Sequence, residues 1–192
     1  MRSKHCNLMA KPETAYLYAR EKHKGKTRAD GITPDIIHLE AVVSRLKSIG
    51  VTDDDVLCAA WLHDVMESTE TTFDDIYERF GQRVAVLVST LSKDKNLPKK
   101  EIETQYVKQL QGAPFEAKLI KLCDISANLK SLDSSMVSKN KRKKATNKML
   151  HYLGIIKTDL IEKRSDYPKI ESIIKGINEI LKEKHQRQIK LD

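Results

Sequence analysis

The chain has 192 residues, is 40% hydrophobic and 32% charged, and carries a formal net charge of +8. That length allows one sizeable domain with a buried core, and the low content of glycine (7), proline (5) and aromatic residues (5%) favours helices over sheets. The chain lacks an apolar run of about 18 residues, an N-terminal apolar signal core and a CxxC pair, which excludes a membrane-spanning helix and a zinc–thiolate site and predicts a cytoplasmic protein.

Helical periodicity is the main signal along the chain, and no segment reads as a strand. The predicted helices lie at residues 12–23, 35–50, 52–67, on both sides of Gly81 within 72–92, at 101–110, at 114–132 and in a helical hairpin over 139–186. The expected fold is therefore all-α, with residues 1–192 forming a single domain. Its catalytic core is expected at about 12–132, with the C-terminal hairpin following it.

Capping signals place several of the predicted boundaries. Asp35 is a candidate N-cap for one helix and Gly50 its stop, and the next helix is predicted to open at Thr52, with carboxylates in its first turn. Residues 24–34 form a basic loop broken by glycine and proline. The C-terminal hairpin is expected to pack on the catalytic bundle or on a second subunit, which leaves a homo-oligomer open.

Four ionisable residues interrupt otherwise apolar helical segments. They are His38, His63, Asp64 and Asp124. A buried imidazole or carboxylate is costly unless it is paired, hydrogen-bonded or bound to a metal. One such residue is more often a satisfied core residue than a ligand, but four on three helices favour a site for manganese, iron, zinc or magnesium. Glu67 follows His63 by four residues and lies on the same helix face, so it is expected beside the metal, where it could orient or deprotonate a water.

The segments around these residues resemble a known family. They are "TPDIIH" (33–38), Leu62-His63-Asp64 with Glu67, "FGQRVAVLV" (80–88) and "AKLIKLCDISANL" (117–129). Their order and surroundings resemble the HD-domain metal-dependent phosphohydrolases, and more closely the ppGpp hydrolase domain of RelA/SpoT proteins and the single-domain small alarmone hydrolases. The likeness extends from about residue 12 to residue 132, and the tail beyond 138 is similar only in being helical.

This resemblance implies an all-α bundle that holds one Mn²⁺ ion. The implied ligands are His38, His63, Asp64 and Asp124. The implied reaction removes the 3′-pyrophosphate of the guanosine alarmones ppGpp and pppGpp, releasing GDP or GTP and pyrophosphate. Glu67 and Asn128 would be the catalytic residues, and Asn128 would also lie near the nucleotide ribose.

Substrate contacts are expected from the basic loop and from the segment that follows the His-Asp pair. Lys22, His23 and Arg28 are predicted to contact the nucleotide, because cationic side chains neutralise a leaving pyrophosphate. Ser68 joins them as a substrate-binding residue, and it stands where the family has a second carboxylate. Asp35 and Leu39 also depart from the family pattern. The base-binding pocket could therefore differ, which keeps adenosine alarmones such as ppApp open as substrates.

Two alternatives follow from the same residues. The chain could be an HD phosphohydrolase acting on another nucleotide, or a catalytically impaired homologue that binds alarmones or RNA. The segment 138–150 carries six lysines and arginines, which is more typical of a solvated helix start than of a nucleic-acid surface. A nucleotide is thus the expected partner, and nucleic acid is not favoured.

Overall fold

The computed structural model describes residues 12–132, 138–184 and 186–190, and within these residues every regular element is a helix. The helices are α1 (Pro12–Lys22), α2 (Asp35–Ser48), α3 (Asp54–Leu62), α4 (Val65–Ser68), α5 (Phe73–Phe80), α6 (Gln82–Leu91), α7 (Lys99–Gln111), α8 (Phe115–Ser131), α9 (Lys139–Glu162) and α10 (Ile170–Glu183). The all-α expectation is confirmed. The basic loop after α1 is closed by one isolated bridge between Thr27 and Pro34.

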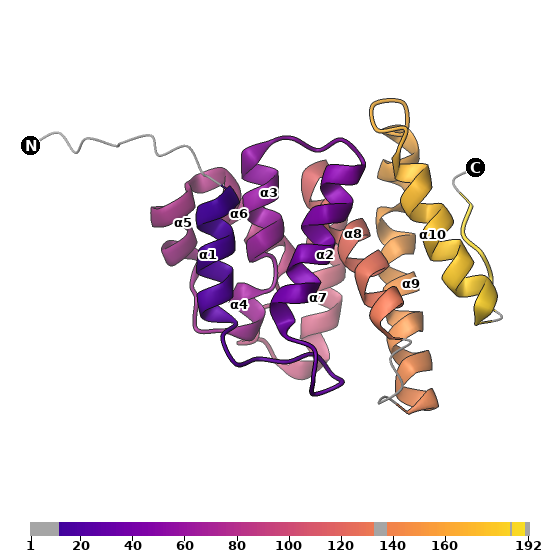
Figure 1. The fold of residues 1–192 in the computed structure, drawn as a ribbon, viewed down its shortest axis with the longest axis horizontal. Coiled ribbons are helices and arrows are strands. Elements are labelled where there is room, and N and C mark those ends of the chain that lie inside the picture. The colour runs from indigo at the N-terminus through magenta and orange to yellow at the C-terminus, as the bar shows by residue number, and fades with distance from the viewer. Residues whose placement is uncertain (1–11, 133–137, 185, 191–192) are drawn as a thin grey trace, which may run out of the picture.

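Helix α8 lies at the centre of the arrangement in Figure 1, between the N-terminal helices and the C-terminal pair. It packs against α2, α3 and α6 on one side and against α9 and α10 on the other. Most of its residues are buried, including the functional candidate Asp124. A helix that is buried on nearly all faces is a core helix, so polar residues in the middle of α8, such as Asp124, lie inside the protein.

The helix predicted over 52–67 is wrong as a single element. It is divided into α3 and α4, because His63 and Asp64 form a turn between them. Asp64 has φ −100° and ψ −8°, outside regular helix geometry. The i,i+4 relation expected between His63 and Glu67 therefore does not apply, and the placement of Glu67 has to be taken from its own contacts.

Two of the predicted helix starts also need correction. Helix α3 is capped by Asp53, whose side chain accepts hydrogen bonds from the backbone N–H groups of Asp55 and Val56, so Thr52 lies outside the helix. Pro34 occupies the N-cap position of α2, and Asp35 is the first helical residue. That position turns the Asp35 carboxylate toward His23 instead of toward the backbone of its own helix.

The C-terminal helices pack against the N-terminal bundle, which is one of the two arrangements expected for them. Helix α9 contacts α7 and α8, and α10 contacts α8. Lys118 of α8 is buried and its Nζ lies 2.6 Å from an Asp159 carboxylate oxygen on α9, which ties the two helices together. The turn at Tyr167 and Pro168 separates α9 from α10, as predicted. In the described part of the chain, no helix is both long and apolar enough to cross a bilayer.

Candidate metal centre and its pocket

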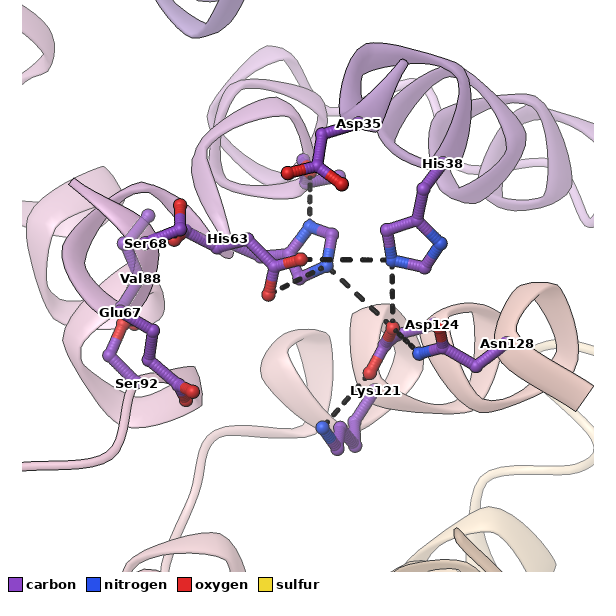
Figure 2. A network of polar contacts seen from close by, with 12 residues as sticks. Asp35, His38, His63, Glu67, Ser68, Val88, Ser92, Lys121, Asp124 and Asn128 are labelled. Carbon is purple, nitrogen blue, oxygen red and sulfur yellow. Dashed lines mark hydrogen bonds and ion pairs between the residues drawn. The ribbon is translucent and has the colours of Figure 1, made fainter. Parts of the chain in front are cut away.

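Three buried side chains from separate parts of the chain meet at one point. His38 comes from α2, His63 from the turn after α3, and Asp124 from α8, and one ligand atom from each lies within 4.8 Å of the others. Asp124 Oδ1 is 3.0 Å from His38 Nε2 and 3.7 Å from His63 Nε2. Figure 2 shows both imidazole rings turned toward the Asp124 carboxylate. The structure thus brings together three of the four ligands expected from the sequence.

The ring of His63 is oriented for metal binding. Its Nδ1 lies 2.8 Å from the carbonyl oxygen of Ala60, and because a carbonyl can only accept, Nδ1–H is the donor. In the neutral ring, Nε2 then carries the lone pair. The Nε2 atoms of His38 and His63 are both buried and make no hydrogen bond within the described residues. Two orphaned imidazole nitrogens beside a buried carboxylate fit a divalent cation, because N and O donors of this kind are what such ions bind.

Asp64 lies at the open edge of this cluster. Its carboxylate oxygens are 3.4 Å from His63 Nε2 and 3.8 Å from His38 Nε2, and its side chain is 37% exposed. It comes from the turn that separates α3 from α4, so its carboxylate reaches the two rings from the solvent side. The arrangement therefore offers three buried donors and one more accessible carboxylate.

Neighbouring charges hold the acids of the cluster ionised. Burial alone would raise the pKa of Asp124, but Lys121 and the two histidines hold that pKa well below its ordinary value. Burial likewise opposes protonation of His63, yet Asp64 and Asp124 raise the pKa of His63 to about 9. A cation arriving at the cluster therefore meets carboxylates that are already charged and displaces a proton from an imidazole.

Asn128 and Arg28 extend the cluster toward the basic loop. The Asn128 amide donates to Asp124 Oδ1 at 2.5 Å, and its carbonyl oxygen accepts a hydrogen bond from the Arg28 guanidinium. Asn128 lies one turn after Asp124 on α8, so the same helix face carries both. The side-chain amide of Asn128 thus links the basic loop to the metal cluster. This link is what we expect if Arg28 and Asn128 serve one site.

Glu67 and Ser68 follow the cluster on α4. Glu67 Oε1 accepts the backbone N–H of Lys93 at 2.8 Å, which fixes the carboxyl group beside the loop after α6. The Ser68 hydroxyl donates to the carbonyl oxygen of Asp64 at 2.7 Å and lies 3.4 Å from Nε2 of the buried His23. Ser68 and His23 therefore brace the turn that carries Asp64.

The predicted nucleotide contacts differ in where the structure places them. His23 is buried, with Nδ1 3.6 Å from Asp35, and burial lowers its pKa although Asp64 and Asp35 oppose that shift. Lys22 is exposed, and its ammonium lies 5.4 Å from the centroid of the Tyr18 ring. Neither residue lines the pocket described next.

A cavity of about 240 Å³ opens on the metal cluster. It is lined by His63, Asp64, Glu67, Leu91, Lys93, Ile120, Lys121, Asp124, Ile125, Asn128, Ala145, Lys148, Met149 and Tyr152. The lining combines the carboxylates of the cluster with three lysines, one each from the loop after α6, from α8 and from α9. A pocket that combines a candidate cation site with several ammonium groups suits a small polyanion.

Sequence reasoning missed these three lysines. Lys121 Nζ lies 2.9 Å from Asp124 Oδ2, and its place in the apolar run "LIKLCD" was a usable signal, because a lysine there needs a partner. Lys93 follows α6 in a charged connection, where nothing local distinguishes it from Lys95. Lys148 reaches the pocket only through the packing of α9, which is a long-range property.

Comparisons with known proteins agree with this geometry. An HD domain family profile matches residues 15–153. The guanosine-3′,5′-bis(diphosphate) 3′-pyrophosphohydrolase MESH1 of Danio rerio is 41% identical over 118 residues, which are 60% of this chain and 66% of that protein. The bifunctional (p)ppGpp synthase/hydrolase SpoT of Escherichia coli (strain K12) is 36% identical over 178 residues, 85% of this chain and 25% of SpoT. The chain thus spans slightly less than two thirds of the first relative and a quarter of the second.

A solved structure is similar over almost its whole length. It is described as a metazoan ortholog of SpoT that hydrolyzes ppGpp and plays a role in starvation responses. The TM-score is 0.73 at 29% sequence identity, covering 91% of this chain and 96% of that one. The similarity therefore includes the C-terminal helices as well as the N-terminal bundle.

Proposed function

The chain belongs to the HD domain family, and from that premise we propose that it hydrolyses the 3′-pyrophosphate of guanosine alarmones with Mn²⁺ as its cofactor. The products would be GDP or GTP and pyrophosphate. The observation that carries the proposal is the convergence of His38, His63 and Asp124 at the side of a lysine-lined pocket. The named activities of MESH1 and SpoT support the same reaction.

The proposed ligands of the single ion are His38, His63, Asp64 and Asp124. A divalent cation at these donors would neutralise phosphoryl charge and lower the pKa of water. Manganese suits the mixed set of imidazole and carboxylate donors. The low pKa of Asp124 leaves its carboxylate charged, and the hydrogen bond from His63 Nδ1 to Ala60 directs Nε2 to the cation once that nitrogen has lost its proton.

Glu67 is the proposed general base. Its carboxyl group lines the pocket and is held through Oε1 by the backbone of Lys93, so its orientation does not depend on the substrate. A base fixed in this way can accept a proton from the attacking water. Asn128 and Arg28 would contact the nucleotide at the other side of Asp124, where their hydrogen bond already joins them.

Hydrolysis is tested by incubating the purified protein with ppGpp, with and without Mn²⁺, and measuring pyrophosphate release. We expect saturable release by the manganese-loaded wild type and a loss of at least about a thousandfold in Asp124→Ala, which removes a ligand. If pyrophosphate were released from ppApp but not from ppGpp, the substrates would be adenosine alarmones instead of guanosine alarmones. Tight ppGpp binding without turnover would make the protein a binder.

A binding-only function is favoured by one specific observation. Ser68 is neutral, and its hydroxyl is used to brace the carbonyl of Asp64. The pocket therefore depends on Glu67 as the carboxylate on α4 that faces it. An active wild type would show that catalysis proceeds with Ser68 beside Glu67, and loss of activity in Glu67→Gln with full ppGpp binding would show that the Glu67 carboxylate is required. An inactive wild type that binds ppGpp would support the binder.

We further propose that residues 1–192 form one domain that works in the cytoplasm. The contacts of α9 and α10 with α8, and the Lys118–Asp159 ion pair, support one domain. The C-terminal helices already cover α8, so an oligomer is not needed to bury it. A nucleotide remains the proposed partner, because the lysines that line the pocket surround a cavity of nucleotide-phosphate size.

A further inference from the structure

Two tyrosine rings lie at the lysine side of the pocket: Tyr152 lines the cavity, and Tyr106 is buried against it. We call Tyr106 and Tyr152 the tyrosine wall; their ring centroids are 5.2 Å apart in an edge-to-face arrangement. The ammonium of Lys93 lies 4.6 Å and 5.2 Å from the two centroids, and that of Lys121 lies 5.4 Å and 5.1 Å from them. Lys148 lies 5.8 Å from the Tyr152 ring. Attraction to the rings holds these cations close together despite their mutual repulsion.

Two of the three lysines are already neutralised by carboxylates. Lys121 is 2.9 Å from Asp124, and Lys148 is 3.0 Å from Glu103 of α7. Glu103 also accepts a hydrogen bond from the Tyr152 hydroxyl at 2.5 Å, so one carboxylate fixes both a lysine and a ring of the wall. These two lysines are therefore committed to partners within the protein.

Lys93 differs from the other two. Among the described residues, no carboxylate lies within ion-pair distance of its ammonium, although the side chain is half-buried. Burial lowers the pKa of Lys93, and Lys148 and Lys121 lower it further, against the opposing effect of Glu67 and Glu103. An anion that reached this ammonium would relieve both the burial cost and the repulsion.

The backbone of Lys93 sets its side chain between the proposed base and the tyrosine wall. Its N–H donates to Glu67, and its side chain lines the same cavity as Asp64 and Asp124. A group bound there would lie within the pocket that holds the metal cluster. A diphosphate is the class of ligand that fits, because one end can face the cluster while the other meets an ammonium.

We propose that Lys93 is a substrate-contact residue that binds the pyrophosphate group beside Tyr152, while Glu103 neutralises Lys148 and leaves Lys93 as the unpaired lysine of the pocket within the described part of the chain. This inference rests on the proposed function. It gives Lys93 the role of neutralising the negative charge of the leaving pyrophosphate. Lys93 would then stabilise pyrophosphate as product as well as in the substrate.

The test measures the binding of inorganic pyrophosphate by isothermal titration calorimetry, on metal-free protein and with one equivalent of Mn²⁺. Lys93→Gln is compared with wild type, with Lys93→Arg, which keeps the charge, and with Lys95→Gln, whose exposed side chain lies outside the pocket. Removing one charged contact predicts a dissociation constant about tenfold higher for Lys93→Gln. Lys95→Gln should stay within about twofold of wild type, and Lys93→Arg within about threefold. Thermal unfolding confirms that each variant folds, and Lys93→Met replaces Lys93→Gln if that variant does not.

Equal affinities of Lys93→Gln and Lys95→Gln for pyrophosphate would overturn the inference, as would a wild type that binds none in either state. The outcome is separable from that of the proposed function, because binding requires no turnover. A wild type that binds pyrophosphate through Lys93 but leaves ppGpp intact would reject the hydrolase alone. Turnover of ppGpp with no dependence of pyrophosphate binding on Lys93 would reject this inference alone.

Discussion

The imidazole of His63 is hydrogen-bonded at one nitrogen and faces carboxylates with the other, and this makes the site sensitive to pH. Nδ1 is bound to the Ala60 carbonyl, and Nε2 faces two carboxylates that raise the pKa of His63 to about 9. In the metal-free protein the imidazolium is thus stabilised by folding. A bound cation needs the neutral ring, so protons and metal compete for one nitrogen.

The stability of the metal-free protein is expected to fall as the pH rises. Because the pKa of His63 is higher in the folded state than the unfolded value of about 6.5, its contribution is full below pH 6.5 and is lost as the pH approaches 9. The loss should be on the order of 3 kcal/mol. This loss is measured by urea unfolding, at a series of pH values, of protein kept metal-free with a chelator. A free energy of unfolding that rises across this range would contradict the assignment, and saturating Mn²⁺ should remove the effect.

Glu67 can be tested as the base without disturbing the metal. Glu67→Gln keeps the size of the side chain and an oxygen for the Lys93 N–H, but it cannot accept a proton. We expect kcat for ppGpp to fall at least about a hundredfold, with metal content unchanged. Glu70→Gln is the matched control, since Glu70 is exposed and lines no part of the pocket. A similar kcat for both variants would remove Glu67 from the mechanism.

At the scale of elements, the positions of the helices were largely predictable and the turn between α3 and α4 was not. Apolar periodicity and the glycine at the α5–α6 junction marked those helices, because these are local signals. Nothing local ends the helix at Leu62, since the residues after it are compatible with helix geometry. The turn arises where His63 and Asp64 face the cluster, so tertiary contacts override propensity there. Glu67 was predicted near the metal cluster from a single continuous helix; the helix is interrupted, yet Glu67 lines the same cavity as His63 and Asp124, and its Oε1 accepts the Lys93 N–H.

The start of α3 provides a test of local capping. Asp53 caps two backbone N–H groups and also accepts two hydrogen bonds from Arg83 on α6. Asp53→Ala should lower the free energy of unfolding by about 1–2 kcal/mol, mainly through loss of the cap. Asp54→Ala, which removes an exposed carboxylate from the same turn, should change it by less than about 0.5 kcal/mol. Urea denaturation measures the free energy of unfolding of both variants. Equal losses in the two would contradict the capping assignment.

At the scale of the whole molecule, the C-terminal helices are part of the site. Helix α9 contributes Lys148 and Tyr152 to the pocket, and α10 packs on α8, the helix that carries Asp124. The sequence indicated the hairpin but not its role, because its likeness to the family beyond residue 138 was only helical. The metal-cluster candidates were readable because they interrupt apolar helices. The lysine side of the pocket depends on how distant helices pack, which no local pattern shows.

If the chain unfolds as one cooperative domain, a destabilising substitution in α10 will also lower the stability reported by α3. Ile177 of α10 is fully buried, whereas Glu179 on the same helix is exposed. Ile177→Ala should lower the free energy of unfolding by about 2–4 kcal/mol, and Glu179→Ala by less than about 0.5 kcal/mol. Unfolding is followed by the fluorescence of Trp61, the single tryptophan, which lies on α3, and by circular dichroism. Coincident shifts of both signals support one domain, and a shift seen only by circular dichroism would contradict it.

The proposed hydrolysis depends on a single cation held by His38, His63, Asp64 and Asp124. Metal analysis of protein reconstituted with excess Mn²⁺ and then desalted tests it most directly. We expect one manganese ion per chain in the wild type and almost none in Asp124→Ala, with both proteins folded. Equal manganese in the two proteins, or none in either, would contradict it.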